Sequence, residues 1–258
     1  RSGNYSIDIV DTGVFGLDGG SMFGVVPKAL WKKAYHEGDQ ENRIPLAAKP
    51  LLLQNKSKKI LIDTGNGTKY SEKLQKIYKI DIESSNFDLA LKPFGLKRED
   101  ITDVILTHLH FDHAGGATID VNGEIMPTFP NAKYYVQKEQ YEWGLNPTLK
   151  DQGSFMKNDY LPLKENGMLE LLDGEGDIFE GMRVIPVNGH TQGMQMVEID
   201  TGEHNFLYLA DLCPTHAHVN YPFVMGYDNF PLTALAEKQK YFPIAYEKQS
   251  ILIFEHDA

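Results

Sequence analysis

Cysteine is almost absent from this sequence, because Cys213 is the only one among 258 residues. An internal disulfide is therefore excluded, and so is a zinc site built from several thiolates. Any metal ion that the protein binds must be held by nitrogen and oxygen ligands.

Long apolar runs and an excess of basic charge are also missing. No apolar run approaches the roughly 18 residues of a membrane-spanning helix, and no segment like a signal peptide opens the chain. Lys and Arg number 25 against 36 Asp and Glu, a formal net charge of -11, and no basic stripe could follow a phosphate backbone. We therefore expect a cytoplasmic protein that binds neither membrane nor nucleic acid, with a leader removed ahead of Arg1 as the alternative.

The apolar residues fall into short runs closed by turn residues, without repeats or low-complexity linkers. Their composition predicts strands at 58–62, 103–107, 133–136, 182–187, 194–199, 205–210 and 251–254, with 194–199 and 205–210 paired as an antiparallel hairpin. Apolar spacing predicts helices over 71–78, 86–92, 137–144 and 232–241. A chain of this length and pattern is expected to form one α/β domain over residues 1–258, with sheets covered by helices.

The sequence THLHFDH, at 107–113, places three histidines and an aspartate within six residues. Residues two apart share a face in an extended segment, so His108 and His110 would point to one side, while Asp112 and His113 would fold back from the following glycine turn. Crowded imidazoles repel one another when protonated and lose hydrogen-bond partners when buried, unless a cation takes their lone pairs. The cluster therefore predicts a metal site rather than a set of surface histidines.

Further ligands are expected, because one catalytic zinc usually takes only three protein ligands and four candidates already lie in this segment. His190 follows the predicted strand at 182–187, Asp211 ends the strand at 205–210, and His256 follows the last strand. Strand ends are where a rigid scaffold presents site residues. Each of the three has an ordinary alternative as a turn or terminal residue, but together they predict the rest of a two-metal site.

In this order, THLHFDH, GHTQG, LADL and FEHD resemble the metallo-β-lactamase superfamily of metal-dependent hydrolases, over most of the chain from residue 62 onwards. The resemblance implies a four-layer αββα sandwich with the metal site at one edge of the sheets. It also implies two divalent metals: one held by His108, His110 and His190, and one held by Asp112, His113 and His256, with Asp211 bridging both. Asp63, after an early strand, would orient ligands, and a turn-forming aspartate is the alternative.

The chemistry that this resemblance implies is hydrolysis. Two cations roughly 3.5 to 4 Å apart can share a water and lower its pKa, which supplies a bridging hydroxide as nucleophile. The hydroxide would open a lactone or related ester, and Asp112 would orient it and pass a proton to the leaving group. Zinc is the first candidate for these ligands, and manganese and iron also accept them.

The substrate wall is expected in the segment 15–31, which together with 227–231 is similar to predicted quorum-quenching lactonases and relatives of methyl parathion hydrolase. Its glycines predict a hairpin tip at which Met22 and Phe23 form an apolar wall for an acyl or aryl group, and packing in the core is the alternative.

One departure from the lactonases of N-acyl homoserine lactones concerns the tyrosine that these enzymes commonly carry soon after the bridging aspartate. Leucine, cysteine and proline follow Asp211 here. A substitute donor could come from His216, His218 or Tyr221, although both histidines are otherwise expected to be exposed loop residues.

Two other functions stay open: a phosphotriesterase-type hydrolase of organophosphates, and a metal-dependent sensor or binding protein without turnover. The expected partner is a small-molecule ester or lactone, and a homodimer is compatible with the sequence.

Overall fold

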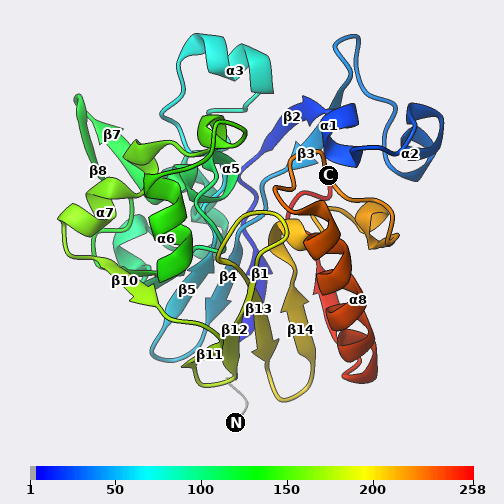
Figure 1. Cartoon of the computed structure of the whole chain (residues 1–258). Helices are drawn as coiled ribbons and strands as arrows, with labels where there is room; N and C mark the ends of the chain where they lie inside the picture. The colour runs from blue at the N-terminus through cyan, green and yellow to red at the C-terminus, as the bar shows by residue number, and fades with distance from the viewer. Residues whose placement is uncertain (1–3) are drawn as a thin grey trace. The chain divides into compact units, whose positions relative to one another are not determined.

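The computed structural model describes residues 4–258, whose contacts divide the chain into two compact units. Unit 2 consists of residues 5–14 and 47–173, and unit 1 contains residues 15–46 and 174–258. Figure 1 follows the chain through both units by colour. The organisation of residues 1–258 as one domain stays a prediction.

Unit 2 is built on a six-stranded mixed sheet. Its strands, in spatial order, are β1 (Ser6–Ile9), β4 (Leu51–Gln54), β5 (Lys59–Ile62), β6 (Asp103–Ile105), β9 (Lys133–Gln137) and β10 (Leu169–Leu172). The strands from β5 to β10 are parallel. β5 lies inside this mixed sheet, antiparallel to β4 and parallel to β6, and Ile60, Leu61 and Ile62 are fully buried. Burial on both faces explains the apolar run that predicts this strand.

The remaining elements of unit 2 are short. They are the helices α3 (Glu72–Tyr78), α4 (Phe87–Ala90), α5 (Phe111–Ala114), α6 (Lys138–Leu145) and α7 (Leu161–Glu165), and the hairpin of β7 (Thr118–Val121) with β8 (Glu124–Pro127). Ser71 and Asn86 cap the first two helices by accepting hydrogen bonds from the backbone N–H of Leu74 and Asp88. Three helices therefore lie at the positions predicted from apolar spacing.

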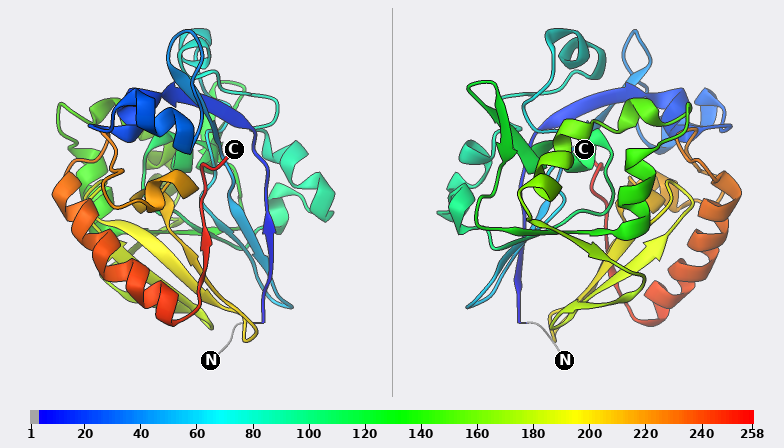
Figure 2. Two further views of the ribbon diagram at one scale, coloured as in Figure 1. Left: turned by 90° about the vertical axis from the view of Figure 1, so that its right-hand side faces the viewer. Right: turned by 60° about the vertical axis from the view of Figure 1, so that its left-hand side comes forward.

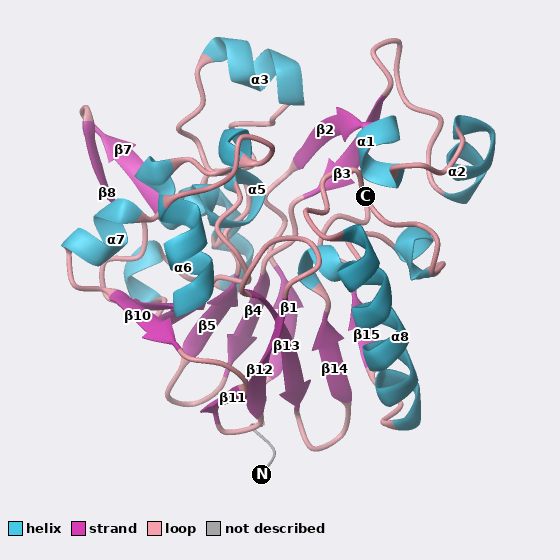
Figure 3. Cartoon of the chain, viewed as in Figure 1, coloured by secondary structure: helices cyan, strands magenta, loops and turns pink. Residues whose placement is uncertain are grey.

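Unit 1 contains a five-stranded sheet (Figure 3). Its strands are β11 (Gly176–Phe179), β12 (Met182–Val187), β13 (Met194–Asp200), β14 (Asn205–Tyr208) and β15 (Ile251–Ile253). Strands β11 to β14 pair antiparallel, which confirms the predicted hairpin, and β15 is parallel to β14. The connection between β14 and β15 includes α8 (Pro231–Glu247), which runs along this sheet (Figure 2). The mixed strands and helices of both units confirm the predicted α/β class.

Two predictions about unit 1 are wrong in detail. The segment after β2 (Val14–Asp18) is not a hairpin tip but the helix α1 (Gly19–Phe23), followed by α2 (Lys28–Ala34); β2 pairs instead with β3 (Arg43–Ala47). Asp18 caps α1 by accepting a hydrogen bond from the backbone N–H of Ser21 at 2.7 Å. A Cβ on Gly19 would lie 2.5 Å from the ring of Trp31, so this glycine serves close packing rather than a turn.

The second difference concerns α8, which was predicted over 232–241 and continues to Glu247 through Pro243. Proline lacks the backbone N–H that donates a hydrogen bond in the interior of a helix, so a helix is usually expected to end before it. Pro243 lies on the exposed side of α8, while Ala234 and Ala245 are buried on its other side. In the part of the chain from residue 4 onwards, no helix is long and apolar enough to span a bilayer.

Candidate metal centre

The first cluster of candidate ligands lies in unit 2, directly after β6. His108 and His110 are both buried, and Nε2 of His108 is 3.1 Å from Nδ1 of His110. Nδ1 of His108 lies 3.0 Å from the Thr107 hydroxyl, which leaves Nε2 as the atom that faces the second imidazole. Two buried imidazole nitrogens directed at one point form a donor pair suited to a cation.

Asp112 and His113 lie in α5, a single helical turn that replaces the predicted loop. Both are buried, and Oδ2 of Asp112 is 3.9 Å from Nε2 of His113. The rings of His108 and His113 are 4.0 Å apart between centroids. The turn of α5 therefore brings all four residues of the HxHxDH motif into one buried cluster of unit 2.

Asp63, in the loop after β5, contacts the first cluster through Thr107 and His113. One carboxylate oxygen accepts a hydrogen bond from the backbone N–H of Thr107 at 2.7 Å. The other accepts the Thr107 hydroxyl at 2.7 Å and lies 3.1 Å from Nδ1 of His113. Asp63 has a left-handed backbone, with φ of 59°, which costs a non-glycine residue about 1–2 kcal/mol. Its three hydrogen bonds hold that conformation and turn Nε2 of His113 towards Asp112.

The second cluster lies in unit 1 and contains His190, Asp211 and His256. One Asp211 oxygen is 3.3 Å from Nε2 of His190, and the other is 3.3 Å from Nε2 of His256. All three side chains are buried. A carboxylate that faces a different imidazole with each oxygen has the arrangement of a ligand shared by two cations. The preceding residue, Ala210, also has a left-handed backbone (φ 46°), and this turn directs Asp211 back between the histidines.

Asp228 is a buried carboxylate beside the second cluster that the sequence did not predict. Its Oδ1 is 3.0 Å from Nδ1 of His190, and its Oδ2 accepts a hydrogen bond from the backbone N–H of Met225 at 2.9 Å. Asp228 thereby does for His190 what Asp63 does for His113, fixing one ring nitrogen so that the other faces the cluster. The signal for Asp228 in the sequence is its place in the segment 227–231, which carries a resemblance to lactonases.

The residues of the predicted substrate wall do not lie together: some are packed in the core and others are at the surface. Met22 and Phe23 are buried, and the Phe23 ring stacks between Trp31 and His218, with centroids 5.3 and 4.6 Å away. This is the packed arrangement of the alternative interpretation, although in a helix and not a hairpin. His218 is part of this aromatic stack and is buried, so the prediction that it is exposed is wrong.

His218 is fully buried because its polar atoms have partners inside unit 1. Nδ1 lies 2.7 Å from the Thr215 hydroxyl, and Nε2 lies 2.8 Å from the carbonyl oxygen of Met22. The pair is satisfied when Thr215 donates to Nδ1 and Nε2–H donates to Met22, which is the neutral imidazole. Both nitrogens of His218 therefore have partners within the fold.

His216 and Tyr221 lie outside the aromatic stack of Trp31, Phe23 and His218. His216 is exposed, as expected, and its Nδ1 is 2.7 Å from a carboxylate oxygen of Asp257. Tyr221 is 39% exposed and stacks on Phe242. It lines an apolar surface cleft of about 430 Å³ together with Val219, Pro243, Ala245, Tyr246, Ser250 and Leu252.

The neutral state of His218 predicts how the stability of the protein changes with pH. Burial lowers the pKa of His218 from 6.5 to about 3, so the unfolded chain takes up a proton below pH 6.5 that the folded protein does not. Stability is therefore lost as pH falls from 6.5 towards 3. Between pH 7 and pH 5 the loss from this residue is about 2 kcal/mol.

We expect His218→Gln to remove this contribution, because an amide can bond the same carbonyl without titrating. Urea unfolding of the metal-free proteins at pH 7 and pH 5 measures it. An equal loss of stability in wild type and variant would contradict a neutral, buried His218.

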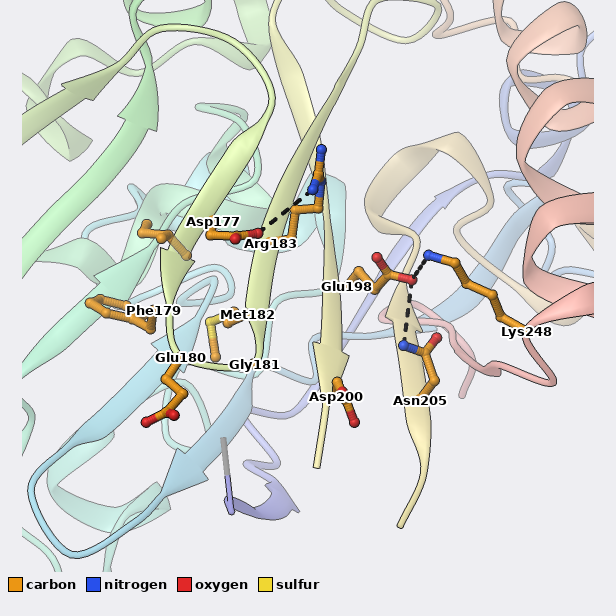
Figure 4. A pocket seen from close by; sticks show the side chains of 11 residues that line it. Asp177, Phe179, Glu180, Gly181, Met182, Arg183, Glu198, Asp200, Asn205 and Lys248 are labelled. Carbon is orange, nitrogen blue, oxygen red and sulfur yellow. Dashed lines mark hydrogen bonds and ion pairs between the residues drawn. The ribbon is translucent and has the colours of Figure 1, made fainter. Parts of the chain in front are cut away.

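A larger cleft of about 940 Å³ lies elsewhere in unit 1, on the strands β11 to β14 (Figure 4). Of the described residues that line it, none is a candidate metal ligand. Two pairs of its charged side chains form ion pairs, Glu198 with Lys248 and Asp177 with Arg183. This cleft is therefore separate from the ligand cluster of the same unit.

Comparisons with known proteins point to one family. The model of the family described as the metallo-beta-lactamase superfamily matches residues 45–247, a range that contains all the candidate ligands except His256. A Bacillus cereus protein described as N-acyl homoserine lactonase is 27% identical over 219 residues, which covers 80% of this chain and 79% of that protein.

Solved structures are similar over almost the whole chain. A structure described as a probable metal-dependent hydrolase from Staphylococcus aureus has a TM-score of 0.92 and 30% identity, covering 100% of this chain and 91% of that one. AidC, described as a dizinc quorum-quenching lactonase and solved with a product, has a TM-score of 0.78 and 22% identity, covering 99% and 88%. These similarities confirm the predicted fold class.

Proposed function

This chain belongs to the metallo-β-lactamase superfamily and is a metal-dependent hydrolase, and from that premise we propose that its substrate is a lactone or a related ester. The observation that carries the proposal is the pair of buried imidazole and carboxylate clusters, one in each unit. The lactonase named among the relatives supports the lactone as the substrate class. With an N-acyl homoserine lactone as substrate, the reaction would quench a quorum signal.

We propose further that the protein holds two divalent metal ions, with zinc as the first candidate. His108, His110 and His190 would hold one, and Asp112, His113 and His256 the other, with Asp211 shared. The donor chemistry fits, because each cluster offers buried nitrogen and oxygen atoms and no thiolate. Two bound cations would lower the pKa of a water molecule and polarise the carbonyl of the substrate.

The protein's own residues would then orient the reaction. Asp112, beside His113, would accept a proton from the attacking water and pass it to the leaving alkoxide. Asp63 and Asp228 would hold the rings of His113 and His190, so that ligand positions are fixed before substrate binds. Preorganised ligands need no rearrangement during the reaction, which lowers its barrier.

We propose that the residues directly after Asp211 do not supply the donor that holds the substrate carbonyl. Leu212 and Cys213 are buried, and His218 is committed to Thr215 and Met22. The protein therefore differs at this position from the tyrosine-containing lactonases that it resembles. We propose that the protein therefore prefers lactones or esters whose carbonyl oxygen does not need a hydrogen-bond donor from the residues after Asp211.

A parallel assay of lactones, aryl esters and an organophosphate triester tests the substrate class. We expect the zinc-loaded protein to hydrolyse N-hexanoyl-homoserine lactone or a simple γ-lactone with a kcat/KM about two orders of magnitude above that for the triester. The reverse order would make the protein a phosphotriesterase. A protein loaded with two zinc ions and inert on all three classes would instead be a metal-dependent binding protein.

A further inference from the structure

Helix α8 presents two neighbouring side chains, Glu237 and Lys238, to the loops that carry the ligand cluster of unit 1. One loop precedes and includes His190. The other runs from Asp211 to Asp228. Each side chain holds one of these loops by hydrogen bonds to its backbone.

Glu237 holds the first loop. Its two carboxylate oxygens accept hydrogen bonds from the backbone N–H of Asn188 at 2.7 Å and of Gly189 at 3.0 Å, immediately before His190. Gly189 is pressed against α8, since a Cβ there would lie 2.3 Å from backbone atoms of Ala234. The backbone N–H of Phe230 also donates to the Gly189 carbonyl at 2.9 Å. The backbone position of His190 is thus set by the first turns of α8.

Lys238 holds the second loop. Its ammonium is buried and donates to the carbonyl oxygens of His218 at 2.9 Å and of Phe223 at 2.7 Å. These carbonyls lie in the middle of the loop that begins at Asp211 and ends at Asp228. Burying a cation is costly unless hydrogen bonds compensate, so the two carbonyls and the ammonium fix one another.

We propose that Glu237 and Lys238 are positioning residues for the metal centre, Glu237 for His190 and Lys238 for the loop that carries Asp211 and Asp228. The inference rests on the proposed function, because it takes His190 and Asp211 as metal ligands. Neither side chain belongs to the proposed set of ligands. Losing either would leave every ligand present but free to move, and changes of this kind lower metal affinity about 10–100-fold.

The test compares matched substitutions on the same helix. Glu237→Gln leaves one acceptor oxygen and turns an N–H group towards a backbone N–H, and Lys238→Met keeps the length of the side chain without its donors. Glu247→Gln and Lys240→Met are the controls, because both residues are exposed on α8. Zinc affinity of the folded, metal-free proteins is measured by competition with a chromophoric chelator, and the visible spectrum of the cobalt-loaded proteins reports ligand geometry.

We expect the zinc affinity of Glu237→Gln and Lys238→Met to fall about 10–100-fold with an altered cobalt spectrum, and the controls to match the wild type. If Lys238→Met does not fold, Lys238→Gln, whose shorter side chain keeps an NH₂ donor group without the charge, is expected to fold with an intermediate zinc affinity. Wild-type affinity and an unchanged spectrum in the variants, with only a lower urea midpoint of the metal-free protein, would overturn the inference. A wild type that binds no zinc would instead overturn the proposed function.

Discussion

Replacing His110 with alanine is expected to lower kcat/KM for hydrolysis by about three orders of magnitude or more. His110 is buried, and its Nδ1 lies 3.1 Å from Nε2 of His108, so the two imidazoles act as one donor pair. Alanine removes one of the two nitrogens and leaves a cavity beside Phe155, whose ring packs on His110 at 4.7 Å. The zinc content should fall from two ions per chain towards one.

The measurement combines steady-state kinetics on the best lactone with metal analysis of the same samples. His204→Ala is the matched control, since His204 is exposed in the turn between β13 and β14 and should leave both values unchanged. Full activity of His110→Ala at two zinc ions per chain would remove His110 from the site.

Replacing Asp211 with asparagine is expected to have an effect of similar size by a different route. The carboxylate lies between Nε2 of His190 and Nε2 of His256, at 3.3 Å from each. An amide of the same shape keeps one oxygen, but it places an NH₂ group against the other imidazole and removes the negative charge that two cations would share. Both metals should therefore weaken together, and the zinc content should fall below one per chain.

Asp228→Asn serves as the comparison for this prediction. Asp228 contacts His190 and not His256, so its loss should reduce zinc affinity only about 10–100-fold and leave turnover at saturating zinc largely intact. If Asp211→Asn retained both zinc ions and hydrolysis, Asp211 would not be a shared ligand. If Asp228→Asn were as severe as Asp211→Asn, the distinction between ligand and orienting residue would fail.

The strands that could be recognised in the sequence are those whose pattern is local. Residues 60–62 are apolar because both faces of β5 are buried between β4 and β6. The strands β13 and β14 are joined by a short turn that fixes their pairing. The short strand β4, at 51–54, was missed although its three leucines are buried. Four residues bounded by Pro50 and Asn55 carry too little periodicity to separate a strand from another buried segment.

The segment after Asp18 shows why other parts could not be predicted. Two consecutive glycines indicate a turn when only neighbours in the sequence are considered. In the fold, Gly19 is required by the ring of Trp31, and the buried state of Phe23 depends on His218, almost two hundred residues further along the chain. The same distance explains why His218 was expected to be exposed.

The sequence by itself determined the chemistry of the candidate site, because the kinds of ligand and the spacing of HxHxDH are covalent properties of a short segment. The resemblance that it carries led to the family that the comparisons show. Only the tertiary structure decided which groups orient those ligands. Asp63 reaches His113 across 50 positions of the chain, Asp228 reaches His190 across 38, and Glu237 and Lys238 act from a helix that folds back on both loops. Such hydrogen bonds depend on how distant segments pack, and no local pattern encodes that packing.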